Sequence, residues 1–293
     1  MNITAIDSVE NMAPETFRKQ YYEPRKPLII KGLSRQWPAR EKWTWDYFKS
    51  IAGHQTVGVY NNERAGAGTL VNGADDYIRF GDYLDMIQQG PVTLRIFLFN
   101  IFQHAPGIVD DFTWPDHLAK GFLKKYPMLF VGGAGSVAHM HYDIDLSHIF
   151  HTQFIGRKRV LLLENRQSPY IYRMPFTVES AASFVNWHQE LDTEQFPALR
   201  YARGYTAILE HGDTLFMPGG YWHHMEYIDS GFAMSLRALD QTLTGKLNGL
   251  YHIVGLRGMN NLLIKLAPQW WYHYKRKMAH EKARRALEAI NNE

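Results

Sequence analysis

Residues 139–159 read HMHYDIDLSHIFHTQFIGRKR, and residues 212–227 read GDTLFMPGGYWHHMEY. In a β-strand, side chains two residues apart point to the same face, so His141 and Asp143 can bind one metal ion together. His223, much later in the chain, can supply a third ligand. Two imidazoles and one carboxylate on one face of an octahedron, with the opposite face open, are typical of non-haem Fe(II) oxygenases. The spacing therefore predicts a metal centre of this kind.

The residues around both stretches give alternating strand and turn signals. A glycine-rich turn at 132–136 precedes the first stretch, and residues 149–154 favour a strand that ends at the turn-forming Gly156. Residues 205–210 are strand-like, and the Pro-Gly-Gly run at 218–220 breaks the short strand before His223. The sequence therefore predicts two hairpins that converge on one site.

Three longer segments resemble, in order and spacing, the cupin-like JmjC hydroxylases, and among them the factor-inhibiting-HIF asparaginyl hydroxylases. They are GSVAHMHYD (135–143), QFIGRKRVLL (153–162) and FPALRYARGYTAILEHGDTLFMPGGYWHHMEY (196–227). KPLIIKGLSRQWPAREKWTWDYF (26–48) resembles the opening of that domain, so the resemblance covers roughly residues 15 to 240. It implies a mainly β fold with flanking helices, in which a double-stranded β-helix (jelly roll) forms the core and helices follow at the C-terminus.

The resemblance also implies the chemistry. It implies Fe(II) as the metal, and 2-oxoglutarate and O2 as co-substrates that are converted to succinate and CO2. His141, Asp143 and His223 match the iron ligands of the family. The family's H-x-D motif, in place of the H-x-E common among its histone demethylases, favours side-chain hydroxylation over N-demethylation.

Four neighbouring histidines compete for the metal. His139 points to the same face of the strand as His141, but it falls where the family has a residue that is not a ligand. His224 points to the opposite face from His223 by alternation. His148 and His151 are expected to line the pocket or to pack in the core.

A dicarboxylate co-substrate requires a cation at its far end, because a carboxylate buried without a partner costs several kcal/mol. Lys158 occupies the position at which the asparaginyl hydroxylases place their co-substrate-binding lysine. The alternative is that Lys158 and its two arginine neighbours form a solvated charge run at a hairpin tip. If Lys158 points inward, Arg157 and Arg159 point outward.

The sequence departs from these hydroxylases at three co-substrate positions. Phe97 replaces a tyrosine, Ala138 replaces a threonine, and Arg237 replaces an asparagine. Two hydroxyl donors are lost, and a guanidinium that can bind a carboxylate with two hydrogen bonds is gained. Arg237 is expected to hold the co-substrate; the alternatives are that it binds an acidic substrate or pairs with a local acid.

The chain divides into three segments. Residues 1–91 predict mixed α/β elements that flank the barrel, including a helix that ends at Gly53. Residues 92–240 predict the catalytic jelly roll. Its insert, 165–204, is expected to form a substrate wall with these residues: Tyr170, Tyr172, Arg173, Trp187 and His188.

Residues 241–293 predict C-terminal helices with a break at Pro268. Apolar residues recur at helical spacing through 246–266 and must pack on something: either a second subunit, as in the related hydroxylases, or the barrel. The basic run at 275–285 is interpreted as a solvated helix face, with contact to the ribosome, nucleic acid or an acidic partner as the alternatives.

The composition is that of a single catalytic domain of 293 residues with a formal net charge of only +3, which makes nucleic acid an unexpected partner. The chain has no cysteine, and it contains no leader-like segment and no apolar run of the length of a membrane span. The expectation is a cytoplasmic enzyme. Three functions are considered: an oxygenase acting on a protein or peptide side chain, the same chemistry on a small metabolite, and a cupin that binds metal or ligand without catalysis.

Overall fold

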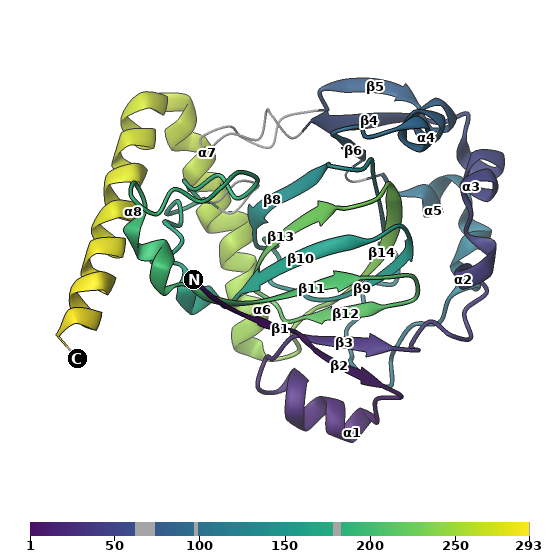
Figure 1. Cartoon of the computed structure of the whole chain (residues 1–293), viewed down its shortest axis with the longest axis horizontal. Coiled ribbons are helices and arrows are strands. Elements are labelled where there is room, and N and C mark those ends of the chain that lie inside the picture. The colour runs from purple at the N-terminus through teal and green to yellow at the C-terminus, as the bar shows by residue number, and fades with distance from the viewer. Residues whose placement is uncertain (62–73, 97–98, 178–182, 293) are drawn as a thin grey trace.

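Two β-sheets form the centre of the molecule in the computed structural model, which describes residues 1–61, 74–96, 99–177 and 183–292 (Figure 1). The smaller sheet contains, in spatial order, β1 (Asn2–Ala5), β11 (Arg203–Leu209), β10 (Lys158–Leu163), β13 (Trp222–Tyr227) and β8 (Val137–His141). The larger sheet contains, in spatial order, β2 (Asp7–Glu10), β3 (Leu28–Lys31), β12 (Thr214–Met217), β9 (His148–Ile155), β14 (Gly231–Ala238), β7 (Met128–Gly132), β6 (Leu94–Ile96), β4 (Thr56–Asn61) and β5 (Asp76–Arg79).

Helices surround this β core (Figure 1). Before the metal-binding motif they are α1 (Pro14–Phe17), η1 (Arg18–Tyr22), α2 (Ala39–Lys42), α3 (Trp45–Ala52), α4 (Phe80–Gln89), α5 (Ile101–His104) and η3 (Pro106–Asp111). After it they are η4 (Asn165–Gln167), η5 (Pro197–Tyr201), α6 (Leu243–Leu250), η6 (Tyr251–Leu256), α7 (Arg257–Leu266) and α8 (Pro268–Asn291). In Figure 1, α2, α3 and α5 lie at the right, α7 and α8 at the left, and α1 below the strands. The expected mainly β cupin-like fold with C-terminal helices is confirmed.

The two sheets face each other across an aliphatic core. Val160 and Leu162 from the smaller sheet pack with Ile149 and Leu215 from the larger one, and all four are buried. Between Val160 and Lys158, Arg159 is exposed, as alternation along β10 requires. This pattern fixes which side chains of the smaller sheet enter the barrel and which leave it.

Glycines form the predicted turns. Gly156, between β9 and β10, has φ +72°, and a Cβ there would lie 2.5 Å from the carbonyl oxygen of Ser230. Gly212, in the turn before β12, has φ +83°. A residue with a Cβ is strained in this conformation, so both positions favour glycine.

The N-terminal segment contributes to both sheets. β1 pairs in parallel with β11, and β3 pairs with β12. The predicted helix before Gly53 is α3, which begins after Thr44, whose hydroxyl accepts a hydrogen bond from the Tyr47 amide. Strands from residues 2–79 thus add β1 to the smaller sheet and β2, β3, β4 and β5 to the larger one.

The C-terminal helices pack over the insert. α8 begins at Pro268, as expected, and its Ala283 is buried against the insert residues Tyr172 and Trp187. Tyr172 and Trp187 were expected to form a substrate wall, but they lie in this second core because the insert is covered by α8. No helix in the described ranges is long and apolar enough to cross a membrane.

Candidate metal centre and co-substrate pocket

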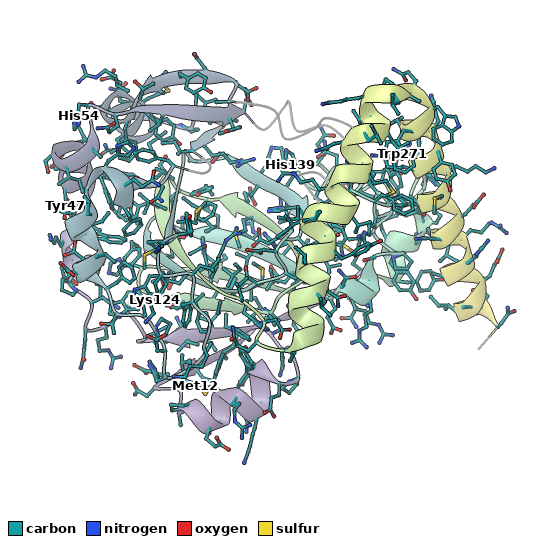
Figure 2. All side chains as sticks on the ribbon, turned by 180° about the vertical axis from the view of Figure 1, so that it is seen from behind. Met12, Tyr47, His54, Lys124, His139 and Trp271 are labelled. Atoms are coloured by element: carbon teal, nitrogen blue, oxygen red, sulfur yellow. The ribbon has the colours of Figure 1, made fainter. Side chains whose placement is uncertain are left out.

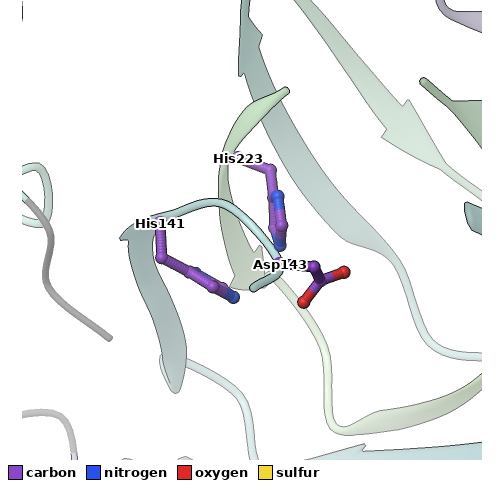
Figure 3. Close-up of side chains that lie close together, drawn as sticks. All are labelled: His141, Asp143 and His223. Atoms are coloured by element: carbon purple, nitrogen blue, oxygen red, sulfur yellow. The ribbon is translucent and has the colours of Figure 1, made fainter. Parts of the chain in front are cut away.

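His141, Asp143 and His223 come together in the barrel, and a potential ligand atom from each lies within 4.8 Å of the others (Figure 3). His141 is the last residue of β8 and pairs with His223 on β13. Their ring centroids are 4.1 Å apart. The expectation that His141 and Asp143 lie two residues apart on one strand is wrong. β8 ends at His141, and Asp143 lies in the loop that follows. The three predicted residues nevertheless form one cluster.

Both imidazoles are oriented by the backbone. Nδ1 of His141 lies 2.6 Å from the carbonyl oxygen of His139, and Nδ1 of His223 lies 3.2 Å from that of Tyr221. A carbonyl oxygen only accepts, so Nδ1 carries the proton in each ring and Nε2 is left with a free lone pair. Such outer contacts fix the tautomer of metal-binding histidines. The donor set therefore fits a divalent transition metal.

The protonation states also suit a metal. Burial, followed by the nearby His223, lowers the pKa of His141 to about 3. Burial likewise lowers the pKa of His223, although Asp143 opposes this shift. For Asp143, burial acts to raise the pKa, but Arg237 and the two imidazoles outweigh it and the pKa lies below its usual value. At neutral pH the site thus offers two neutral imidazoles and one carboxylate.

Arg237 supports the aspartate. Its Nη2 donates to Oδ1 of Asp143 at 3.1 Å, and its Nη1 donates to Oδ2 of Asp145 at 3.2 Å. The charge of Asp143 raises the pKa of Arg237 further, so the guanidinium stays charged. Of the three roles considered for Arg237, pairing with local acids is the one that the structure shows. Binding of the co-substrate by Arg237 stays a prediction.

Lys158 lies inside the barrel, with 1% of its surface exposed. Its neighbours point outward: Arg157 pairs with Asp229, and Arg159 pairs with Glu226. The Nζ atom of Lys158 lies 3.0 Å from Nε2 of His151 and 4.2 Å from the centroid of the Tyr227 ring. Within the described residues it has no carboxylate partner, and burial lowers its pKa to about 7.

His151 was expected to line the pocket or to pack in the core, and it is buried beside Lys158. Its Nδ1 lies 2.8 Å from Oγ of Ser235, and the two residues are paired across β9 and β14. With Nε2 it accepts from the Lys158 ammonium, because burial, followed by Lys158 and His223, lowers its pKa well below the usual value. The contact depends on the register between strands far apart in sequence, so no local signal could have identified it.

The other competing histidines are not part of the cluster. The ring of His139, which Figure 2 labels, is 6.4 Å from that of His224, and the pairing of β8 and β13 has a register shift between His223 and Met225. His148 is buried, accepts from the Gly219 amide and stacks on Phe216. Ala138 lies on β8 beside the core, and Phe97 falls outside the described residues.

Comparison with known proteins places these residues in context. The cupin-like domain family matches residues 14–246. Lysine-specific demethylase 8 of Xenopus tropicalis is 26% identical over 238 residues, which cover 79% of this chain and 52% of that protein. The lysine-specific demethylase JMJ30 of Arabidopsis thaliana is 25% identical over 238 residues, which cover 78% of this chain and 54% of that protein. tRNA wybutosine-synthesizing protein 5 of Gallus gallus is 25% identical over 251 residues, which cover 79% of this chain and 76% of that protein.

The match accounts for the core of the chain and its candidate metal ligands. The chain spans about half the length of the demethylases it matches. The JmjC-type members of this family use Fe(II) and 2-oxoglutarate. Because the family match spans most of the chain and includes the metal cluster and Lys158, the chain belongs to the cupin-like domain family in its JmjC-type form.

Proposed function

We propose that this chain is an Fe(II)- and 2-oxoglutarate-dependent oxygenase that hydroxylates a side chain of a protein or peptide. The observation that carries the proposal is the cluster of His141, Asp143 and His223, in which each imidazole presents Nε2 because its Nδ1 faces a carbonyl oxygen. The buried Lys158 supports it, because an ammonium without a carboxylate partner suits a dicarboxylate co-substrate.

In the proposed reaction, Nε2 of both histidines and the Asp143 carboxylate hold the iron, and Arg237 keeps that carboxylate charged and oriented. When bound, Fe(II) with O2 and 2-oxoglutarate supplies the oxidising power for inserting oxygen into a C–H bond. Lys158 binds the distal carboxylate of 2-oxoglutarate. Ser235 orients the His151 ring, which in turn positions the ammonium.

Side-chain hydroxylation is proposed because the motifs resemble those of the asparaginyl hydroxylases. The relatives named as lysine-specific demethylases and as a tRNA wybutosine-synthesizing protein make methylated lysine peptides and tRNA necessary members of any substrate panel. The same chemistry on a small metabolite is the alternative, since Lys158 and the metal cluster suit either substrate.

Succinate formation tests the proposal. The Fe(II)-loaded protein is incubated with 2-oxoglutarate, O2 and a panel of peptides, tRNA and metabolites, and succinate is measured together with the mass change of each substrate. A gain of one oxygen atom on a peptide, coupled to succinate, is the expected result. Absence of both succinate formation and 2-oxoglutarate binding would leave a non-catalytic cupin.

We also propose that two copies of the chain associate through α6, η6 and α7. These elements expose a run of large apolar side chains, namely Leu247, Leu250, Tyr251, Ile253, Val254, Leu262 and Leu266. Exposed apolar patches of this kind are typical of protein interfaces. Sedimentation of the wild-type protein should give twice the 34.1 kDa chain mass, and Leu250→Glu should return it to one. A monomeric wild-type protein would contradict the proposal.

A further inference from the structure

A cavity lies on the opposite face of the smaller sheet from the metal cluster. It has a volume of about 310 Å³ and is lined by residues of the insert, η6 and α8. The C-terminal helices, which include η6 and α8, are drawn in yellow-green and yellow in Figure 2. Its apolar wall is formed by Pro169, Pro175, Phe176, Leu256 and Ala279. Its polar residues are Ser168, Arg173, His252 and Lys282, and none of the lining residues that the structure describes is an aspartate or a glutamate.

Arg173 is a cation on the cavity wall with no carboxylate partner in the described part of the chain. Its Nη2 donates to the hydroxyl of Tyr142 at 2.7 Å, and its guanidinium lies over the rings of Tyr142 and Trp222. Its Nε is buried and has no hydrogen-bond partner among the residues that the structure describes, nor does any of these provide it with a carboxylate. Arginine keeps its charge in proteins, so a partly buried guanidinium favours an anionic partner.

Two further donors surround the same cavity. Nδ1 of His252 is buried and also lacks a hydrogen-bond partner within the described chain. Lys282, on α8, is exposed at the cavity, whereas Lys277 on the same helix pairs with Glu281. Ser168 is already engaged, since its hydroxyl accepts from the indole of Trp222 at 3.0 Å. Three nitrogen donors from three separate segments therefore surround one space.

We propose that this cavity binds the phosphate group of a small organic phosphate monoester, held by Arg173, His252 and Lys282. A phosphate monoester has three terminal oxygens, which match three donors better than the two oxygens of a carboxylate do. The volume is at the lower end of the range for small-molecule sites, and the apolar wall leaves a surface for the organic part of the ligand.

The cavity is separate from the metal centre but lies directly behind it. Trp222 precedes His223 on β13, so by strand alternation its ring leaves the barrel where the imidazole enters it. Tyr142 follows His141 just beyond the end of β8, and its ring lies 4.7 Å from that of Trp222. Both aromatic residues are buried, and neither Lys158 nor any of the three candidate metal ligands lines the cavity. The site is thus independent of the proposed oxygenase chemistry.

Titration calorimetry of the EDTA-treated protein with inorganic phosphate, at constant ionic strength, tests the proposal. Removing the metal excludes phosphate binding at the iron cluster. We expect saturable binding with a Kd of about 1 mM or tighter, since anions bound by several charged donors reach this range. Lys282→Ala should weaken binding about tenfold or more, and the matched control Lys277→Ala should leave the Kd unchanged.

The ligand class is tested with two further probes. Phenyl phosphate should bind more tightly than inorganic phosphate because its ring can contact the apolar wall. Benzoate, which has the same ring with a carboxylate in place of the phosphate, should bind at least tenfold more weakly than phenyl phosphate. Arg173→Met should abolish binding of every probe. Equal effects of Lys282→Ala and Lys277→Ala, no saturation by phosphate up to about 20 mM, or benzoate binding as tight as phenyl phosphate would each overturn the proposal.

Discussion

The affinity for 2-oxoglutarate should fall as the pH rises above neutrality, because Lys158 must be protonated to bind the distal carboxylate. Burial lowers the pKa of Lys158 to about 7 in the free protein. A bound carboxylate raises this pKa again, so binding takes up a proton when the free lysine is neutral. With a free-state pKa of about 7, the apparent Kd should rise about tenfold for each pH unit above 7 and change little below pH 6.

Calorimetric titration under anaerobic conditions, with Mn(II) in place of iron, measures this directly. Repeating it in buffers of different ionisation enthalpy should show uptake of about 0.9 proton per 2-oxoglutarate at pH 8 and about 0.1 at pH 6. The metal ligands do not contribute to this dependence, because the pKa of His141 is about 3 and those of Asp143 and His223 also lie below their usual values.

Variants at two adjacent positions test whether Lys158 causes this pH dependence. Lys158→Ala should weaken 2-oxoglutarate binding about ten- to a hundredfold, the value of a charge-assisted hydrogen bond, and remove its pH dependence. Arg157→Ala is the matched control, because Arg157 is exposed and pairs with Asp229 outside the barrel. A Kd that is constant between pH 6 and 9 in the wild-type protein would refute the reasoning.

Three other changes test the metal cluster and its surroundings. His141→Ala should abolish Fe(II) retention measured by metal analysis, while His139→Ala should retain the metal; the opposite result would reassign the ligand. Arg237→Asn should lower the affinity for Mn(II) about ten- to a hundredfold, as the loss of a hydrogen-bond partner of a metal ligand does, because Asp143 loses its donor at 3.1 Å. If only the affinity for 2-oxoglutarate fell, Arg237 would instead be a co-substrate residue. Gly219→Ala should reduce the free energy of unfolding by about 1–3 kcal/mol, measured by denaturant titration. A Cβ at this position would lie 2.0 Å from the carbonyl oxygen of Leu146, in the loop between β8 and β9 that contains Asp143. Gly258→Ala, where a Cβ meets nothing within 4 Å, is its control, and equal stability of the two variants would count against this packing argument.

The sequence by itself determined the parts of this protein that depend on local periodicity. Alternation along a strand is local, so it correctly separated the inward Lys158 from the outward Arg157 and Arg159. The turns at Gly156 and Gly212 followed from a conformation that only glycine adopts readily. Motif order then identified the three metal-binding candidates that the fold brings together.

Contacts between segments distant in sequence were decided only by the tertiary structure. Lys158 meets His151, and His151 meets Ser235, because β9 lies between β12 and β14 in one particular register. The pairing of Arg237 with Asp143 and Asp145 and the position of Arg173 beneath α8 likewise depend on how the sheets and C-terminal helices pack. The physical reason is that a one-residue change of register moves a side chain to the other face of its sheet, and no local pattern specifies which strands become neighbours.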